Sequence, residues 1–204
     1  MAGTQTTDTQ KPNTLKHRAV LALGSNLGES EDTLERAVAD LVAGGVQLVR
    51  VSGLYRTAPV GGPAGQPDFV NAVIEVTTDL GAYELLALCN AVEAAHHRER
   101  LVRWGPRTLD IDVIDYDGVI SEDPVLTLPH PRAQERAFVL VPWAQMDPLA
   151  RLTVTRRAEP SGERADEVPE PLSREVVSVA ELARTLVEAD EDAISYMREM
   201  QVPD

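Results

Sequence analysis

The chain has 204 residues and a net charge of −14, and 43 % of its residues are hydrophobic, which suits one domain with a buried core. The acidic balance argues against a protein that binds nucleic acid, because such proteins normally carry a basic excess. No apolar run reaches the length of a membrane-spanning helix, and the N-terminus lacks the apolar stretch of a secretory signal. We therefore expect a cytoplasmic protein with no membrane contact.

The first part of the chain predicts a strand followed by a helix. Residues 1–17 are rich in Thr and Gln and predict a disordered tail. Residues 18–24 place apolar side chains on both faces of a strand, and residues 24–28 predict a loop. Ser30 is expected to cap a helix that ends at the glycine pair 44–45.

The middle of the chain predicts two strands, a helix and a further strand. Residues 46–57 and 69–77 are strand-like. The loop between them is long and rich in Pro and Gly, which is typical of a functional or a disordered loop. Residues 82–97 carry apolar residues at helical spacing, with the single cysteine, Cys89, on the apolar face. A buried structural thiol is expected there, and an intrachain disulfide is excluded. Residues 108–116 predict the last strand, which an Asp-Gly turn closes.

The order β-α-β-β-α-β predicts an α+β fold with a ferredoxin-like core, in which helices cover one face of an antiparallel sheet. We place this domain at residues 18–150. Within it, residues 123–131 predict a Pro-bearing loop and residues 138–143 a short apolar segment.

The remaining residues, 151–204, predict an acidic and partly disordered extension. Residues 155–176 are rich in Glu, Arg and Pro and poor in apolar residues, which predicts disorder. Ser178 and Glu181 have the spacing of a capping box, and the apolar residues after them predict a helix. We expect the extension to end in this helix, packed back on the domain.

Two aspartates in the last predicted strand are the first candidates for chemistry. Residues two apart on a strand point to the same face, so Asp110 and Asp112 project together while Leu109, Ile111 and Val113 face the core. Adjacent carboxylates repel each other unless a positive group lies between them. Mg²⁺ suits this place, because it binds one or two carboxylates together with substrate phosphates. The alternative is a solvated strand face that carries two acids.

Four arginines lie in the ten residues before this strand, namely Arg98, Arg100, Arg103 and Arg107. Guanidinium groups match phosphate oxygens in pairs, and phosphoryl transfer depends on positioning and on neutralising charge. A solvated charged loop is the alternative, but the aspartates beside the arginines favour a phosphate site. Residues 24–28 lack the lysine of a P-loop, so a P-loop nucleotidase is disfavoured.

The stretch RWGPRTLDID at residues 103–112 resembles the signature of the 6-hydroxymethyl-7,8-dihydropterin pyrophosphokinases, which are enzymes of the folate pathway. Further matching pieces follow the family's order: LGSNLG at 23–28, YRT at 55–57, QPDFVN at 66–71 and LPHP at 128–131. The resemblance covers residues 18–150. It implies a magnesium-dependent transfer of diphosphate from ATP to 6-hydroxymethyl-7,8-dihydropterin, with release of AMP, by a monomeric enzyme.

The resemblance also implies a role for each matching residue. Asp110 and Asp112 would hold two Mg²⁺ ions on the ATP phosphates, and with Arg98 and Arg107 they are the expected catalytic residues. The expected pterin-binding residues are Thr57, Ala58, Val60, Phe69, Asn71, Trp104 and Phe138, of which Trp104 and Phe138 would lie on the two faces of the ring. The expected ATP-binding residues are Asn90, Glu93, Arg98, Arg100, Arg107, Val113, Leu126, Thr127, His130 and Arg136.

Two other functions remain open at this point. A ferredoxin-like regulatory module could bind a small anion without chemistry, but the two aspartates would then have no reason to lie beside the arginines. A different magnesium-dependent nucleotidyl transferase would release pyrophosphate rather than AMP.

Overall fold

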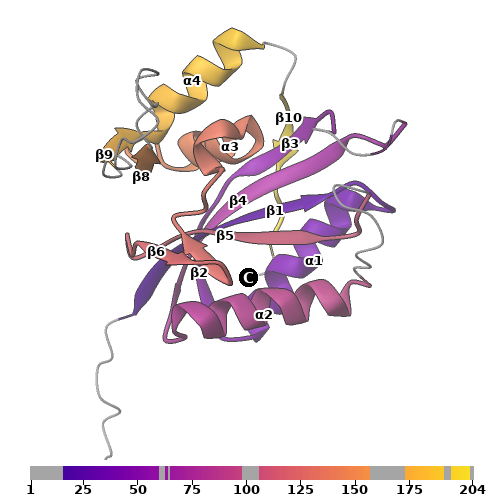
Figure 1. The fold of residues 1–204 in the computed structure, drawn as a ribbon. Coiled ribbons are helices and arrows are strands. Elements are labelled where there is room, and N and C mark those ends of the chain that lie inside the picture. The colour runs from indigo at the N-terminus through magenta and orange to yellow at the C-terminus, as the bar shows by residue number, and fades with distance from the viewer. Residues whose placement is uncertain are drawn as a thin grey trace, which may run out of the picture.

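A computed structural model describes residues 16–59, 63, 65–97, 106–156, 173–190 and 194–202 (Figure 1). The elements in chain order are β1 (His17–Ser25), α1 (Ser30–Ala43), β2 (Val46–Val51), β3 (Gly53–Thr57), β4 (Phe69–Thr78), α2 (Ala82–Ala95), β5 (Asp110–Tyr116), β6 (Ser121–Asp123), β7 (Leu126–Leu128), the 3-10 helix η1 (Ala133–Glu135), α3 (Ala137–Met146), β8 (Arg151–Arg156), β9 (Ser173–Ser178), α4 (Val179–Ala189) and β10 (Ser195–Glu199). The predicted α+β class and the predicted antiparallel sheet are confirmed.

Within the described residues, the main sheet has six strands in the order β10-β3-β4-β1-β5, with β2 paired to β4 beside β3. All of its pairings are antiparallel. The single strand predicted over residues 46–57 is split in two at Ser52. The Oγ of Ser52 accepts a hydrogen bond from the N–H of Val73 at 2.9 Å, so a side chain replaces the backbone acceptor of a regular ladder.

Helices cover both faces of this sheet, so the prediction of helices on one face is wrong. In Figure 1, α1 and α2 lie below the sheet, and α3 and α4 lie above it. Strand β1 supplies both cores, with Ala19, Leu21 and Leu23 in the first and Val20 and Ala22 in the second. The predicted division of these apolar side chains between the two faces of the strand is therefore confirmed.

The second face is covered by α3, and residues after 150 join the same core. Several predictions fail for these later residues. Residues 155–156 and 173–176, predicted to be disordered, belong to the paired strands β8 and β9, and residues 157–172 lie outside the described residues. Ser178 caps α4 as predicted, and its Oγ accepts the N–H of Glu181 at 3.4 Å. The helix packs on the domain, but the extension does not end there, because β10 follows and pairs with β3.

Two boundaries near the start of the chain also differ from the predictions. Strand β1 continues to Ser25, so the loop begins two residues later than expected. The N-cap of α1 is Glu29 rather than Ser30, and the Oγ of Ser30 accepts a hydrogen bond from the Oγ of Ser25 at 3.0 Å. The helix ends at Gly44 as predicted, and Gly45 has a φ of +106°, which favours glycine.

The remaining segments of the domain are more regular than predicted. Residues 121–128 form the hairpin β6–β7 where a loop was expected over 123–131, and the apolar segment 138–143 lies inside α3. Cys89 is buried in the core as predicted, and burial raises the pKa of its thiol to about 12. No helix among the described residues combines the length and the apolar character needed to cross a bilayer.

Candidate active site

A cavity of about 1090 Å³ opens at one end of the main sheet. Its walls come from the end of β1, the end of β3, the start of β4, the start of β5, the second half of α2, the β6–β7 turn and the residues that lead into α3. Segments far apart in the chain therefore meet around one space.

Every predicted site residue that the structure describes lines this cavity. They are Thr57, Ala58, Phe69, Asn71, Asn90, Glu93, Arg107, Asp110, Asp112, Val113, Leu126, Thr127, His130, Arg136 and Phe138. The other predicted site residues, Val60, Arg98, Arg100 and Trp104, lie outside the described residues.

One row across the sheet joins the two halves of the predicted site. The strand register places Gly24 of β1 opposite Asn71 on one side and opposite Asp110 on the other. A Cβ at Gly24 would lie 3.1 Å from the Oδ1 of Asn71, which is tighter than an ordinary contact. The glycine therefore leaves room at the cavity wall between the amide and the carboxylate.

The two aspartates lie on one face of β5, as the sequence predicts, and each meets an arginine. Asp110 accepts a hydrogen bond from the Nη1 of Arg107. Asp112 accepts one from the Nη1 of Arg136 at 3.0 Å. Ile111 between them points to the other face of the sheet and is buried in the core that contains Leu21 and Leu23. We call Arg107–Asp110 and Arg136–Asp112 the cavity pairs.

Each arginine of the cavity pairs also lies over an aromatic ring. The guanidinium of Arg107 is 5.5 Å from the centre of the Phe69 ring, and that of Arg136 is 5.4 Å from the centre of the Phe138 ring. These distances are those of cation–π contacts. Each arginine thus has both an acid and a ring as neighbours, while its guanidinium lines the cavity.

A buried polar pair lies beside this aromatic region. Asn71 is 4 % exposed, and its Nδ2 donates a hydrogen bond to the Oγ1 of Thr57 at 2.9 Å. This bond fixes the amide orientation on a rigid strand. The Asn71 amide can still use its second N–H and its carbonyl oxygen toward a ligand in the cavity.

A buried acid and an imidazole also line the cavity. Glu93 of α2 is buried, and its Oε1 accepts the N–H of Ile111 at 2.7 Å, which ties α2 to the edge strand β5. Burial lowers the pKa of His130, although the charge of Asp112 acts to raise it. The Nδ1 of His130 accepts the N–H of Arg132 at 3.2 Å, which places the proton of the neutral ring on Nε2.

Several residues at the site were missed by the sequence reasoning. Asn26 is buried, and its side chain accepts the N–H of Arg107 at 2.8 Å and donates to the carbonyl of Pro67 at 3.1 Å, so it joins the segments before β4 and β5. Its presence in the LGSNLG match was the available signal. The end of α4 also lines the cavity, with Leu186, Ala189 and Asp190, and no local pattern indicated this.

The carboxylates of the site suit a magnesium ion that also binds substrate phosphates. They suit less well a metal that is coordinated by protein side chains alone. Among the described residues, no group of three or more His, Cys, Asp or Glu side chains could hold a metal. Asp110 and Asp112 offer two carboxylates on one face beside an open space. Mg²⁺ is commonly bound by one or two carboxylates plus water and substrate phosphates, so this donor set suits it.

Comparison with known proteins assigns the family. Residues 20–148 match the family described as 7,8-dihydro-6-hydroxymethylpterin-pyrophosphokinase (HPPK). This chain therefore belongs to the HPPK family. The match lies over nearly the whole of the segment that the sequence motifs indicated.

Relatives in the HPPK family extend the match. Proteins named 2-amino-4-hydroxy-6-hydroxymethyldihydropteridine pyrophosphokinase are 46 % identical over 132 residues in Methylorubrum extorquens, covering 64 % of this chain and 83 % of the relative, and 43 % identical over 129 residues in Bacillus subtilis, covering 63 % and 77 %. The protein of that name in Mycobacterium leprae is 43 % identical over 181 residues and covers 83 % of this chain and 92 % of the relative. That alignment extends into the residues after 150, which the motifs did not cover.

Solved structures support the fold. The Plasmodium falciparum HPPK-DHPS structure with pterin and p-hydroxybenzoate has a TM-score of 0.59 at 14 % identity, covering 92 % of this chain and 49 % of that chain. An HPPK-DHPS structure in complex with substrates has a TM-score of 0.58 at 12 % identity, covering 90 % and 48 %. This chain spans about half the length of these chains, and at such identities the likeness concerns the fold alone.

Proposed function

We propose that this member of the HPPK family transfers diphosphate from ATP to the hydroxymethyl group of 6-hydroxymethyl-7,8-dihydropterin and releases AMP. The observation that carries the proposal is the row of Asn71, Gly24 and Asp110 at the wall of one cavity. An amide suited to the edge of a heterocycle and an acid suited to a metal–phosphate complex flank a gap left by a glycine. A pterin bound at one side would present its hydroxymethyl group toward a triphosphate at the other.

The reaction places a clear demand on the protein. The hydroxymethyl oxygen bonds to the β-phosphorus of ATP and loses its proton, and the bond between this phosphorus and the oxygen shared with the α-phosphorus breaks, so that AMP leaves with that oxygen. Such transfers are accelerated mainly by positioning and by charge neutralisation. The residues of the cavity supply these two effects.

Asp110 and Asp112 would hold Mg²⁺, with two ions expected when ATP is bound. Bound Mg²⁺ would neutralise the triphosphate and orient its oxygens. The two carboxylates point from alternate positions of one strand, so β5 fixes their spacing. Rigid placement of this kind is what a phosphoryl-transfer site requires.

Arg107 and Arg136 would change partners when the nucleotide binds. In the structure each one neutralises an aspartate of the cavity pairs. When Asp110 and Asp112 hold metal, the guanidinium groups of Arg107 and Arg136 would be free to bind phosphate oxygens, which they match in pairs. The arginines would then stabilise charge on the triphosphate and on the leaving AMP. Arg98 and Arg100 remain predicted contributors outside the described residues.

The pterin would lie against Asn71, Thr57 and the rings of Phe69 and Phe138. The Asn71 amide is held by Thr57 and can form hydrogen bonds along the edge of the heterocycle. Aromatic faces favour a flat ring, so Phe69 and Phe138 suit a stacking role. Ala58 supplies further wall, and Val60 and Trp104 stay predictions for this pocket.

The nucleotide would lie between α2 and the β6–β7 hairpin. Asn90 and Glu93 line the cavity from the helix, and Leu126 and Thr127 line it from the hairpin. Val113, His130 and Arg136 line the space next to Asp112. This arrangement supports the predicted ATP site.

The finer description of the fold belongs to the same proposal. The strand order β5-β1-β4, with β2 and β3 along the other side of β4, is the order expected of a ferredoxin-like core. We also propose that the enzyme acts as a monomer, as the family resemblance implies.

An assay of products tests the proposed function against its two rivals. The full chain is incubated with ATP, Mg²⁺ and 6-hydroxymethyl-7,8-dihydropterin, and the nucleotide products are separated. Formation of AMP that requires the pterin supports the proposal. Release of pyrophosphate would instead indicate a nucleotidyl transferase, and the absence of both products would indicate a binding module.

A further inference from the structure

The β6–β7 hairpin forms one wall of the cavity, although few of its side chains are buried. Its register pairs Asp123 with Leu126, so Pro124 and Val125 make a two-residue turn, and both line the cavity. Leu126 and Leu128 anchor β7 in the core, but none of the residues of β6 is buried. An isolated two-stranded hairpin has marginal stability. The position of β6 therefore depends on polar contacts.

Asp123 is the centre of these polar contacts. Its Oδ1 accepts the N–H of Val125 at 2.8 Å, and its carbonyl accepts a hydrogen bond from the Oγ1 of Thr127 at 3.0 Å. Its Oδ2 accepts the hydroxyl of Tyr83 at 2.7 Å. One residue thus shapes the turn, holds the Thr127 hydroxyl and connects the hairpin to another element.

The bond from Tyr83 joins the two walls of the proposed nucleotide site. Tyr83 is the second residue of α2, the helix that places Asn90 and Glu93 at the cavity two turns further on. The hairpin that it reaches places Leu126 and Thr127 at the same cavity. The Tyr83–Asp123 bond therefore links helix and hairpin at two residues that do not themselves line the cavity. A second contact, between Arg174 of β9 and Glu122 at 3.1 Å, holds β6 from the other side.

We propose that Tyr83 is a positioning residue for nucleotide binding, which acts through Asp123 to set the gap between α2 and the β6–β7 turn. This inference rests on the proposed function, because it takes the occupant of the gap to be ATP. Loss of the hydroxyl removes the link from α2 and leaves the hairpin attached by the apolar anchors of β7 and by the Arg174–Glu122 contact. The wall formed by Leu126 and Thr127 is then held less firmly. Nucleotide binding must then order this wall, which makes the free energy of binding less favourable. The pterin side of the cavity near Asn71 is unaffected.

The variant Tyr83→Phe tests this, with Tyr196→Phe as a matched control. Tyr196 is 52 % exposed and donates to the Oε1 of Glu199 at 2.8 Å, and Tyr83 is 53 % exposed. Tyr196 lies on β10, which contributes no residue to the cavity wall, whereas Tyr83 lies on α2, which does. The dissociation constant of α,β-methylene-ATP with Mg²⁺ is measured by calorimetry, and steady-state kinetics give kcat and both KM values. We expect a rise of about three- to tenfold in the dissociation constant and in KM for ATP for Tyr83→Phe, as for one lost hydrogen bond.

The accompanying measurements separate positioning from a general structural role. For Tyr83→Phe, kcat, KM for the pterin and the melting temperature should stay close to wild type, and Tyr196→Phe should leave every value unchanged. Combining Tyr83→Phe with Asp123→Asn should weaken nucleotide binding no more than Asp123→Asn alone. Unchanged nucleotide affinity in Tyr83→Phe, or an equal rise in both KM values, would overturn the inference. A wild-type chain that binds no nucleotide would overturn the inference and the proposed function together.

Discussion

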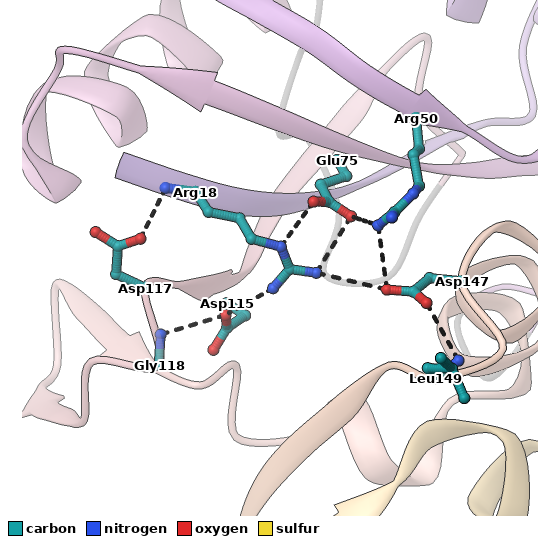
Figure 2. A network of polar contacts seen from close by, with 8 residues as sticks. All are labelled: Arg18, Arg50, Glu75, Asp115, Asp117, Gly118, Asp147 and Leu149. Carbon is teal, nitrogen blue, oxygen red and sulfur yellow. Dashed lines mark hydrogen bonds and ion pairs between the residues drawn. The ribbon is translucent and has the colours of Figure 1, made fainter. Parts of the chain in front are cut away.

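Clusters of arginine and acid lie at both ends of the main sheet. At the end away from the cavity, Arg18 of β1 donates to Glu75 of β4 at 2.7 and 3.2 Å, and Arg50 of β2 donates to the same carboxylate at 2.8 Å (Figure 2). Arg50 also reaches Asp147, the C-cap of α3, at 3.2 Å, and Arg18 lies 4.0 Å from Asp115 of β5. We call these five residues the distal network.

The distal network and the cavity pairs contain the same kinds of side chain but differ in what surrounds the acids. Both oxygens of Glu75 are bonded to arginines, and its side chain is 6 % exposed. The side chains of Asp110 and Asp112 are 23 % and 34 % exposed, and both line the cavity. Where the arginines enclose the acid, the cluster ties strands and α3 together. Where the acid faces open space, we propose that the same pairing exchanges an arginine for a ligand.

The largest expected effect is on activity, which should fall at the cavity end of the sheet and stay unchanged at the distal end. Asp112→Ala should lower kcat by about a hundredfold, or about 3 kcal/mol, because it removes a proposed metal ligand from the transition state. The loss should persist at saturating Mg²⁺, and urea unfolding should show a native fold. Glu75→Gln serves as the control and should turn over at the wild-type rate per folded molecule. Near-normal turnover of Asp112→Ala at saturating Mg²⁺ would refute the metal role.

A substitution in the distal network should affect stability more than activity, unlike one in the cavity pairs. Glu75→Gln should lower the free energy of unfolding by about 2 kcal/mol, a value reduced from that of a fully buried pair because both arginines are partly exposed. Urea unfolding followed by circular dichroism measures it. Asp112→Ala should lower stability by a smaller amount, and an equal loss in the two variants would show that the ends do not differ as described.

The variant Gly24→Ala tests whether the space beside Asn71 at the cavity wall is needed for pterin binding. The new Cβ would crowd the Oδ1 of Asn71 at 3.1 Å and displace an amide that is assigned to the pterin. We expect KM for the pterin to rise by about tenfold, or about 1.4 kcal/mol, with KM for ATP nearly unchanged. Steady-state kinetics with each substrate varied in turn give both values. Equal effects on both substrates would contradict the placement of the pterin beside Asn71.

Local patterns in the sequence predicted the cavity end well. The period of two on β5 placed Asp110 and Asp112 on one face, and a strand imposes that period whatever its partners are. The short motifs then predicted residues that do line one cavity. Such features depend on neighbours within a few residues, so they can be found in a single sequence.

Long-range pairing hid the rest of the structure from sequence reasoning. The distal network joins Arg18 to Glu75 across 57 positions and Arg50 to Asp147 across 97. The strand register brings the two arginines to Glu75, and the packing of α3 on the sheet brings Asp147 to Arg50. Prolines suggested a loop where β6 and β7 pair, because Pro124 lies at the turn itself. Strand β10 has no buried residue that would mark it as a strand, and it forms by addition to the edge of β3.

The smallest expected effect concerns two acids of the distal network with opposite pH behaviour. Burial raises the pKa of Asp115, and the N–H of Gly118 and the charge of Arg18 only partly offset it. Burial also acts to raise the pKa of Glu75, but the bonds and charges of Arg18 and Arg50 outweigh it, so the pKa of Glu75 is lowered. Glu75 therefore stabilises the fold above its ordinary pKa and loses this effect as the pH falls through its folded value. Asp115 weakens the fold as the pH rises through its raised value.

Asp115→Asn should therefore gain stability over wild type as the pH rises. The amide keeps an acceptor for the N–H of Gly118 and removes a buried charge whose nearest arginine nitrogen is 4.0 Å away, so we expect a gain of about 1 kcal/mol at pH 7. Urea unfolding at a series of pH values should show the difference growing from the ordinary aspartate range upward and then levelling off. For Glu75→Gln the deficit should shrink as the pH falls, so the two curves move in opposite senses. If the stability differences of both variants changed in the same direction with pH, the arginines would stabilise the charge of Asp115 as they stabilise that of Glu75. That result would contradict the raised pKa of Asp115.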